Sequence, residues 1–318
     1  MFLYVLQRIG AIALMVAAMS VLIFGATHLL PGNVVTMILG EYSTPEAQAA
    51  MEKKLGLHDP LPVQYWRWAS AFVRGDLGES PITNQPVATV VWPALTQSLV
   101  LAAVSLACVT VFGIGLGVLA AVRKGKPFDH AVSLFGYIGI SVPEFFWAVI
   151  LVVVFAGALR WLPSFGYVPP SAGLRPFLSH LVLPVTTLVL TLMAHVLRMT
   201  RSTMLEVLGS DYVKVARAKG IPERTVLIRH ALRNGLLPTI TVLANDVGFL
   251  IGGIVVIESV FGYPGMGRHL LGAIEHHDLP MLQAIVLILT ATYAATNLTA
   301  DLLYAYFNPK IRYGRAVS

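Results

Sequence analysis

Residues 216–238 have the sequence ARAKGIPERTVLIRHALRNGLLP, a basic stretch in a chain that is otherwise poor in charge. Of the 318 residues, 56% are hydrophobic and only 12% are charged, and the mean hydropathy is +0.74. Such values are typical of a chain that dissolves in lipid rather than in water. The basic stretch therefore predicts a polar loop between membrane-spanning segments.

Six apolar segments lie before and after this loop, and each has about the 20 residues needed to cross the hydrocarbon layer or more. We expect an all-α, polytopic membrane protein whose six transmembrane helices lie at about 9–30, 95–121, 131–159, 179–197, 236–258 and 281–304. The first segment is longer than the apolar core of about 7–15 residues in a signal peptide, so it is expected to remain as a helix. Residues 1–318 then form a single membrane domain, with an external segment or lid at 31–94 and a cytoplasmic loop at 198–235.

Lysine and arginine set the expected orientation, because short cytoplasmic loops carry an excess of them. One side of the predicted membrane domain has Arg8, Arg123, Lys124, Lys126, Arg198, Arg201, Lys214, Arg217, Lys219, Arg224, Arg229, Arg233, Lys310, Arg312 and Arg315. The other side has seven cations, and four of these lie in 31–94, which is too long for the rule to apply. We expect both termini and the basic loop to be cytoplasmic.

The basic loop itself predicts two short helices joined by a tight bend. Ser210 or Asp211 can cap the first helix, Gly220 supplies a left-handed residue at its end, and Pro222 suits the first turn of the second. One face of the first helix combines an aromatic, two small or branched side chains and a cation: Tyr212, Val215, Ala216 and Lys219. Such a helix can bind in a groove on another protein. The alternative is an anchor that lies on anionic lipid headgroups.

The stretch DYVKVARAKG…RHALRN…LP resembles the cytoplasmic loop of ABC importer permeases in the dipeptide, oligopeptide and nickel family. Other motifs resemble the same family in the same order: LQRIG, LLPGNVV, KLGLHDPLPVQYWRW, GDLGES, ISVPEFFWA, FGYPGMGRHLL and DLLYAYFNPKIR. Each motif is weak alone, but together they cover nearly the whole chain and form a specific pattern. The resemblance implies a type I ABC importer permease fold in a bacterial inner membrane.

The resemblance also implies that the loop carries a coupling helix, which docks into a cleft on a cytoplasmic ATPase. The coupling residues carried over are Tyr212, Lys214, Val215, Ala216, Arg217, Ala218, Lys219 and Gly220. The general importer pattern opens with Glu-Ala-Ala, whereas this chain has Lys214-Val215-Ala216, so the resemblance carries over no contact for that glutamate. The implied partners are a second homologous permease, two ATPase subunits or domains, an extracytoplasmic substrate-binding protein and membrane lipid.

No motif in the chain is suited to catalysis or to a cofactor. There is no G-x-x-x-x-G-K-[ST], so ATP and Mg are expected on partner subunits, and this chain is not expected to be an enzyme. GIGLG lies inside a span, where Gly113 and Gly117 predict close helix packing. EHHD at 275–278 predicts a solvated external loop rather than a metal site. The cations lie between apolar spans, so nucleic acid is not an expected partner.

Asp246 lies near the middle of the fifth span, where a carboxylate costs about 2.5–3.5 kcal/mol to insert. It is expected either to attract a cationic part of the cargo or to bond a polar group on an adjacent helix. Nearby Gly248 allows close backbone approach or a bend, and Pro143 predicts a kink before Glu144. These four are the candidate pathway residues. Glu258 is expected to lie near a span end, where water can reach it, and both Glu258 and His195 are expected to have structural roles.

Peptides are the expected cargo, and nickel chelates, glutathione and opines are alternatives within the same architecture. An ion-coupled secondary transporter is the alternative from a different class. It would typically show inverted repeats and several buried acids in matched positions, which this sequence lacks.

Overall fold

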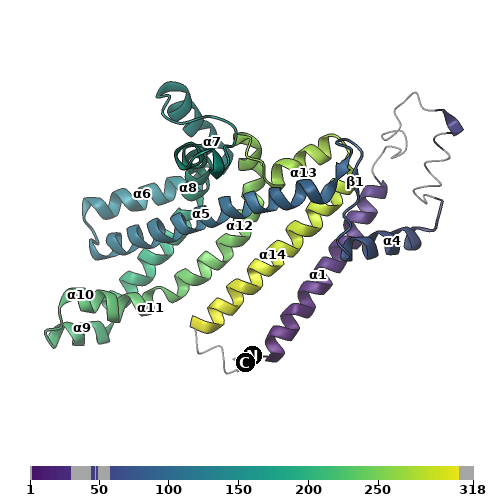
Figure 1. The fold of residues 1–318 in the computed structure, drawn as a ribbon. Coiled ribbons are helices and arrows are strands. Elements are labelled where there is room, and N and C mark those ends of the chain that lie inside the picture. The colour runs from purple at the N-terminus through teal and green to yellow at the C-terminus, as the bar shows by residue number, and fades with distance from the viewer. Residues whose placement is uncertain (1, 30–43, 47, 49–57, 308–318) are drawn as a thin grey trace. The chain divides into compact units, whose positions relative to one another are not determined.

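A computed structural model describes residues 2–29, 44–46, 48 and 58–307 (Figure 1). The chain divides into two compact units, Met1–Gln97 with Pro264–Ala294 and Ser98–Tyr263 with Ala295–Ser318. Helices dominate the described residues, as expected. The exception is an antiparallel pair of two-residue strands, β1 (Glu79–Ser80) and β2 (Gln85–Pro86). Residues 31–43, 47 and 49–57 of the expected external segment at 31–94 lie outside the described residues.

Four helices are long and apolar enough to cross a bilayer, over Leu6–Leu29, Val87–Val122, Leu174–Gly209 and Leu279–Thr299. Two bent pairs are further candidates: Pro127–Ser141 with Glu144–Ala158, bent by 109°, and Leu237–Leu250 with Gly252–Phe261, bent by 51°. The described part of the chain therefore holds four to six candidate spans. These candidates lie at the positions of the six spans that the sequence predicts.

The second unit is built on one central helix, α8 (Leu174–Gly209). Against it pack α6 (Pro127–Ser141), α7 (Glu144–Leu151) and α12 (Leu237–Phe261) (Figure 1). The other helical segments that belong to this unit are most of α5 (Val87–Val122), η1 (Val152–Ala158), η2 (Pro170–Ala172), α9 (Asp211–Ala218), α10 (Glu223–Thr225), η3 (Val226–Leu232), α11 (Arg233–Gly235) and the end of α14 (Leu279–Phe307). Its core consists mainly of leucine and valine side chains from these helices.

Glycines bring α5 and α8 into close contact. A Cβ added at Gly113 would lie 2.9 Å from Cβ of Val196, and one added at Gly117 would lie 2.8 Å from the carbonyl oxygen of Leu197. Lipid tails are as apolar as leucine, so helices in a bilayer associate through such close packing rather than through the hydrophobic effect. The predicted packing role of this G-x-x-x-G pair is confirmed.

The first unit contains α1 (Phe2–Leu29), α4 (Leu61–Val73), the β-hairpin, α13 (Met266–Glu275) and adjoining parts of α5 and of α14 (Leu279–Phe307). Helix α4 packs on α1 through aromatic rings, with Phe24 next to Tyr65 and Trp68. The Tyr65 hydroxyl also lies 2.8 Å from that of Ser20. The sequence did not predict α4 or α13 as helices.

Three expectations need correction. The EHHD segment is not wholly solvated, because Asp278 is buried, accepts a hydrogen bond from Ser80, and caps α14 through the Met281 amide at 3.2 Å. Glu258 is also fully buried, and the Ser98 hydroxyl donates to it over 2.5 Å. Helix α8 continues beyond Arg198 to Gly209, because charged residues end an apolar span but do not break a helix.

Candidate functional site

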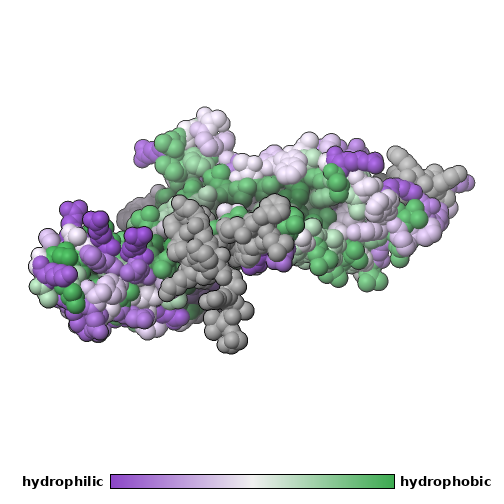
Figure 2. All heavy atoms as spheres, turned by 90° about the horizontal axis from the view of Figure 1, so that it is seen from below, coloured by the Kyte–Doolittle hydropathy of each residue, from purple (hydrophilic) through white to green (hydrophobic). Residues whose placement is uncertain are grey.

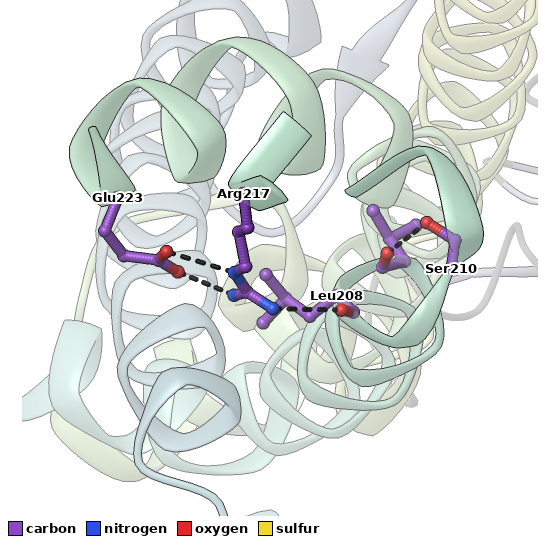
Figure 3. Close-up of polar contacts among 5 residues, drawn as sticks. Leu208, Ser210, Arg217 and Glu223 are labelled. Carbon is purple, nitrogen blue, oxygen red and sulfur yellow. Dashed lines mark hydrogen bonds and ion pairs between the residues drawn. The ribbon is translucent and has the colours of Figure 1, made fainter. Parts of the chain in front are cut away.

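The basic loop forms two helical arms at residues 210–235, here named the elbow. The first arm is α9, and the second runs through α10, η3 and α11, as the sequence predicts. Ser210 stands at the N-cap position of α9 in extended conformation, with φ −69° and ψ 154°. Its hydroxyl does not cap α9. It donates instead to the carbonyl oxygen of Val207 in α8, over 2.5 Å (Figure 3).

Gly220 ends the first arm in the left-handed conformation, with φ +74°. Its amide donates to Arg217 O at 2.9 Å, and the Ile221 amide donates to Ala216 O at 3.3 Å. These two bonds form the Schellman motif, which satisfies the last helical carbonyls and turns the chain sharply. The predicted role of Gly220 as a helix end is confirmed, and Pro222 directly precedes the second arm.

An apolar cluster holds the two arms together. Val213 and Ala216 of α9 and Val226 of η3 are buried against one another, with Val207 and Ile221 packed beside them. Ala216 was expected on the outer face of α9 with Tyr212 and Val215. This expectation is wrong, because Ala216 points into the elbow, where its small side chain allows close packing.

An ion pair closes the elbow from outside. The Arg217 guanidinium donates to both carboxylate oxygens of Glu223, at 2.6 and 3.0 Å, and to Leu208 O at 3.5 Å (Figure 3). Arg217 therefore links the first arm to the second arm and to the end of α8. The same guanidinium lowers the pKa of Glu223 below its ordinary value, because its hydrogen bonds favour the charged carboxylate.

The remaining coupling residues are exposed. Tyr212 is 43% exposed and Val215 52%, and we name these two with exposed Lys219 the α9 outer face. Lys214, Ala218 and Gly220 are also exposed. Hydrophilic side chains gather at the end of the second unit where α9 and α10 lie (Figure 2). The elbow thus presents an aromatic, an aliphatic and a cationic side chain at its surface.

A buried ion pair supports the helices that carry the elbow. The Arg201 guanidinium of α8 donates to both oxygens of buried Asp129, at 2.5 and 2.9 Å, and the Gly125 amide adds a bond of 3.0 Å. Near the elbow, Thr203 donates to Gly235 O at 2.7 Å. The sequence analysis did not single out these residues. The sequence did contain one signal: Arg201 falls at the helical spacing of apolar α8 residues. A cation on that face of the helix indicates a buried partner of opposite charge.

Pro143 interrupts the third predicted span between α6 and α7. The expected kink is confirmed but is sharper than a proline bend inside one helix, since the two helices meet at 109°. Glu144, the first residue of α7, is half-buried, and its carboxylate lies against Gly253 of α12. Gly248 is half-buried in α12. The structure places Glu144 and Gly253 together.

Asp246 is only 2% exposed in α12 and faces His195 of α8. Its Oδ1 lies 3.4 Å from His195 Nδ1, a long hydrogen bond, and its Oδ2 has no partner among the described residues. A cavity of about 550 Å³ opens beside both side chains. The expected contact with a polar group on an adjacent helix is therefore present. Among the described residues, no three His, Cys, Asp or Glu side chains could hold a metal ion.

These features define a multi-pass membrane protein with a polar, internally bonded elbow between two of its candidate spans. Residues 113–313 match the family of binding-protein-dependent transport system inner membrane components, and residues 1–109 match the N-terminal region of such components. The chain belongs to this family. It is an inner-membrane permease subunit of an ABC importer, as the resemblance implies.

Three relatives align with this chain over nearly their whole length. The chain is 38% identical over 310 residues to the probable peptide ABC transporter permease protein y4tP of Sinorhizobium fredii, covering 98% of this chain and 99% of that protein. It is 35% identical over 333 residues to the dipeptide transport system permease protein DppB of Alkalihalophilus pseudofirmus, covering 98% and 100%. It is also 35% identical over 310 residues to the glutathione transport system permease protein GsiC of Salmonella paratyphi A, covering 98% and 99%.

Proposed function

We propose that this chain forms half of the translocation pathway of an ATP-driven importer for di- or oligopeptides. The names of two relatives refer to peptide and dipeptide transport, and both align over 98% of the chain. Glutathione is the second candidate cargo, because a third relative of similar identity is named for it. Glutathione is itself a modified peptide, so the candidates share peptide bonds and charged ends.

The α9 outer face is the proposed contact with a cytoplasmic ATPase. One observation carries this proposal: Tyr212, Val215 and Lys219 are exposed on an elbow that is tied internally by an apolar cluster and an ion pair. Tyr212 also accepts a hydrogen bond of 3.2 Å from the Asn234 side chain of the second arm, which fixes its ring on the elbow. A connection that transmits movement has to be stiff. A lipid anchor needs no such internal bracing, since headgroup attraction requires only basic charge.

The remaining arrangement follows from this contact. Six spans with both termini cytoplasmic put the elbow on the ATPase side. A second homologous permease completes the pore, two ATPases bind ATP and Mg, and an extracytoplasmic binding protein delivers the cargo. Pro143, Glu144, Asp246 and Gly248 are the proposed pathway residues, because they lie at the α6–α7 break or in α12.

Two measurements test this proposal. The tagged chain, purified from its own bacterial membrane, is expected to bring along an ATPase and a second permease, identified by mass spectrometry. Cells that lack the gene are expected to lose ATP-dependent uptake of radiolabelled peptides, tested with L-alanyl-L-alanine, tri-L-alanine and glutathione. Purification without an ATPase, together with uptake driven by an ion gradient, would instead establish a secondary transporter.

A further inference from the structure

We propose that the cavity between α8 and α12 is a binding site for the zwitterionic cargo, in which Asp246 receives the ammonium group and Arg198 the carboxylate. This inference rests on the proposed transport of peptides. It adds a specific site within this chain and a chemical rule for what the site accepts.

The cavity has walls from two helices. One wall has His195, Arg198, Met199 and Ser202 of α8, and the other has Val242, Asn245, Asp246 and Phe249 of α12. Residues three, four and seven positions apart share one face of a helix, so each set forms a continuous surface. The volume of about 550 Å³ lies within the range of about 300–1,000 Å³ that is typical of small-molecule sites.

Asp246 supplies an unsatisfied acceptor. Its side chain is 98% buried, yet its one contact is the long bond to His195, and Oδ2 accepts no hydrogen bond from the described residues. A buried carboxylate normally has several donors, because leaving it unpaired is costly. Oδ2 is shielded from solvent in this conformation, so the proposed binding includes a rotation of the carboxylate toward the cavity that Asp246 lines. An ammonium group, with three donors and a compensating charge, would then fill this deficit.

Arg198 supplies the opposite charge at the same cavity. It is exposed, and among the described residues it has no hydrogen bond or ion pair. Arg201, about one turn further along α8, differs in this respect because its guanidinium donates to both carboxylate oxygens of Asp129. The planar guanidinium of Arg198 is suited to bidentate binding of a carboxylate.

The pair of charges selects among ligands. A cationic ligand would meet Arg198 as well as Asp246, and an anionic ligand would meet Asp246 as well as Arg198. Like charges at close range disfavour binding in either case. A divalent metal ion is disfavoured for the same reason, and only His195 and Asp246 would offer strong ligands to it. A peptide with both ends charged satisfies both residues.

The test uses a cysteine reporter in the cavity of the assembled permease–ATPase complex, without its binding protein. The reporter is Ser202→Cys, because Ser202 is exposed in the cavity wall. The one native cysteine of the chain is removed by Cys108→Ala. The measured quantity is the rate of labelling by N-ethylmaleimide with and without L-alanyl-L-alanine, N-acetyl-L-alanyl-L-alanine, L-alanyl-L-alanine amide or Ni²⁺. Asn245→Cys on the opposite wall serves as a second reporter.

L-alanyl-L-alanine is expected to slow labelling at a concentration at least tenfold lower than either derivative. In Asp246→Asn, the acetylated peptide should protect as well as L-alanyl-L-alanine does. In Arg198→Gln, the peptide amide should protect as well as L-alanyl-L-alanine does. Lys124→Gln, which removes an exposed cation outside the cavity, should change neither. The inference is overturned if no peptide protects either reporter, if all three protect equally, or if Ni²⁺ alone protects. Failure of the ATPase to co-purify would instead contradict the proposed function.

Discussion

Gly220 shows how one residue determines the shape of the elbow. Its φ of +74° and the Schellman bonds turn the chain between the two arms. A residue with a Cβ pays about 1 kcal/mol or more in this conformation. The sequence predicted this position, because a glycine followed two residues later by a proline has few other structural uses.

Gly220→Asp is expected to abolish peptide uptake while the protein remains inserted at its normal level. The added side chain strains the turn and places a negative charge beside the α9 outer face. Gly209→Asp is the matched control, since a side chain at Gly209 meets nothing within 4 Å and the residue lacks a positive φ. Uptake by cells and membrane content on immunoblots measure both variants. Normal uptake by Gly220→Asp would show that this turn has no part in coupling.

Gly117→Val is expected to lower the free energy of unfolding by about 1–3 kcal/mol, because the larger side chain forces α5 away from α8. Thermal unfolding in detergent should show a midpoint several degrees lower. Gly115→Val in the same helix is the control, because Gly115 is exposed and nothing lies within 4 Å of its added Cβ. Equal midpoints for the two variants would contradict the packing role of Gly117.

Partners of buried polar residues were harder to predict than backbone turns. The penalty for a mid-span carboxylate indicates that Asp246 needs a partner, but nothing in the spacing identifies His195, which is 51 residues away. The same holds for Arg201 with Asp129 and for Glu258 with Ser98. Such pairs depend on how helices pack, and packing is a property of the folded chain.

At the scale of elements, apolar length predicts where a helix can cross the membrane but not where it ends. Helix α8 extends to Gly209 because no glycine or proline interrupts it after Arg198. Helices α4 and α13 were missed because they are short and lie in segments rich in turn residues. The two arms of the elbow were predicted, because Gly220 and Pro222 mark their boundary.

The elbow is expected to loosen at acidic pH. Arg217 lowers the pKa of Glu223 from its ordinary 4.5, so the charged pair stabilises the elbow above about pH 4.5. This contribution is lost as pH falls through the lowered pKa of the folded state. A spin label on Lys219→Cys, in a Cys108→Ala background, should become more mobile over this range.

Glu223→Gln separates this pair from other effects of acid. At pH 7 the variant should already show the mobility that the unmodified elbow reaches in acid, and its spectrum should change little with pH. The effect is modest, since both side chains are largely exposed and such pairs are weak. Identical spectra for the two proteins at pH 7 would rule out a bracing role for Glu223.

At the scale of the whole molecule, the distribution of cations predicts that the elbow is cytoplasmic. Lys219→Cys should react with a membrane-impermeant maleimide only in inverted vesicles, and Arg268→Cys only in intact spheroplasts, both in a Cys108→Ala background. The two sites flank the fifth predicted span, 236–258, and are therefore expected on opposite sides of the membrane. Labelling of both from the same side would contradict six spans with cytoplasmic termini.

The most direct test of coupling is a cross-link from the α9 outer face to the ATPase. Val215→Cys, modified with a thiol-reactive photo-cross-linker in the assembled transporter, should yield one covalent product that contains this chain and the ATPase. Leu134→Cys, exposed on α6 within a candidate span, should not. If Val215→Cys and Leu134→Cys both form products only with lipid, the elbow does not contact the ATPase and the proposed mechanism is wrong.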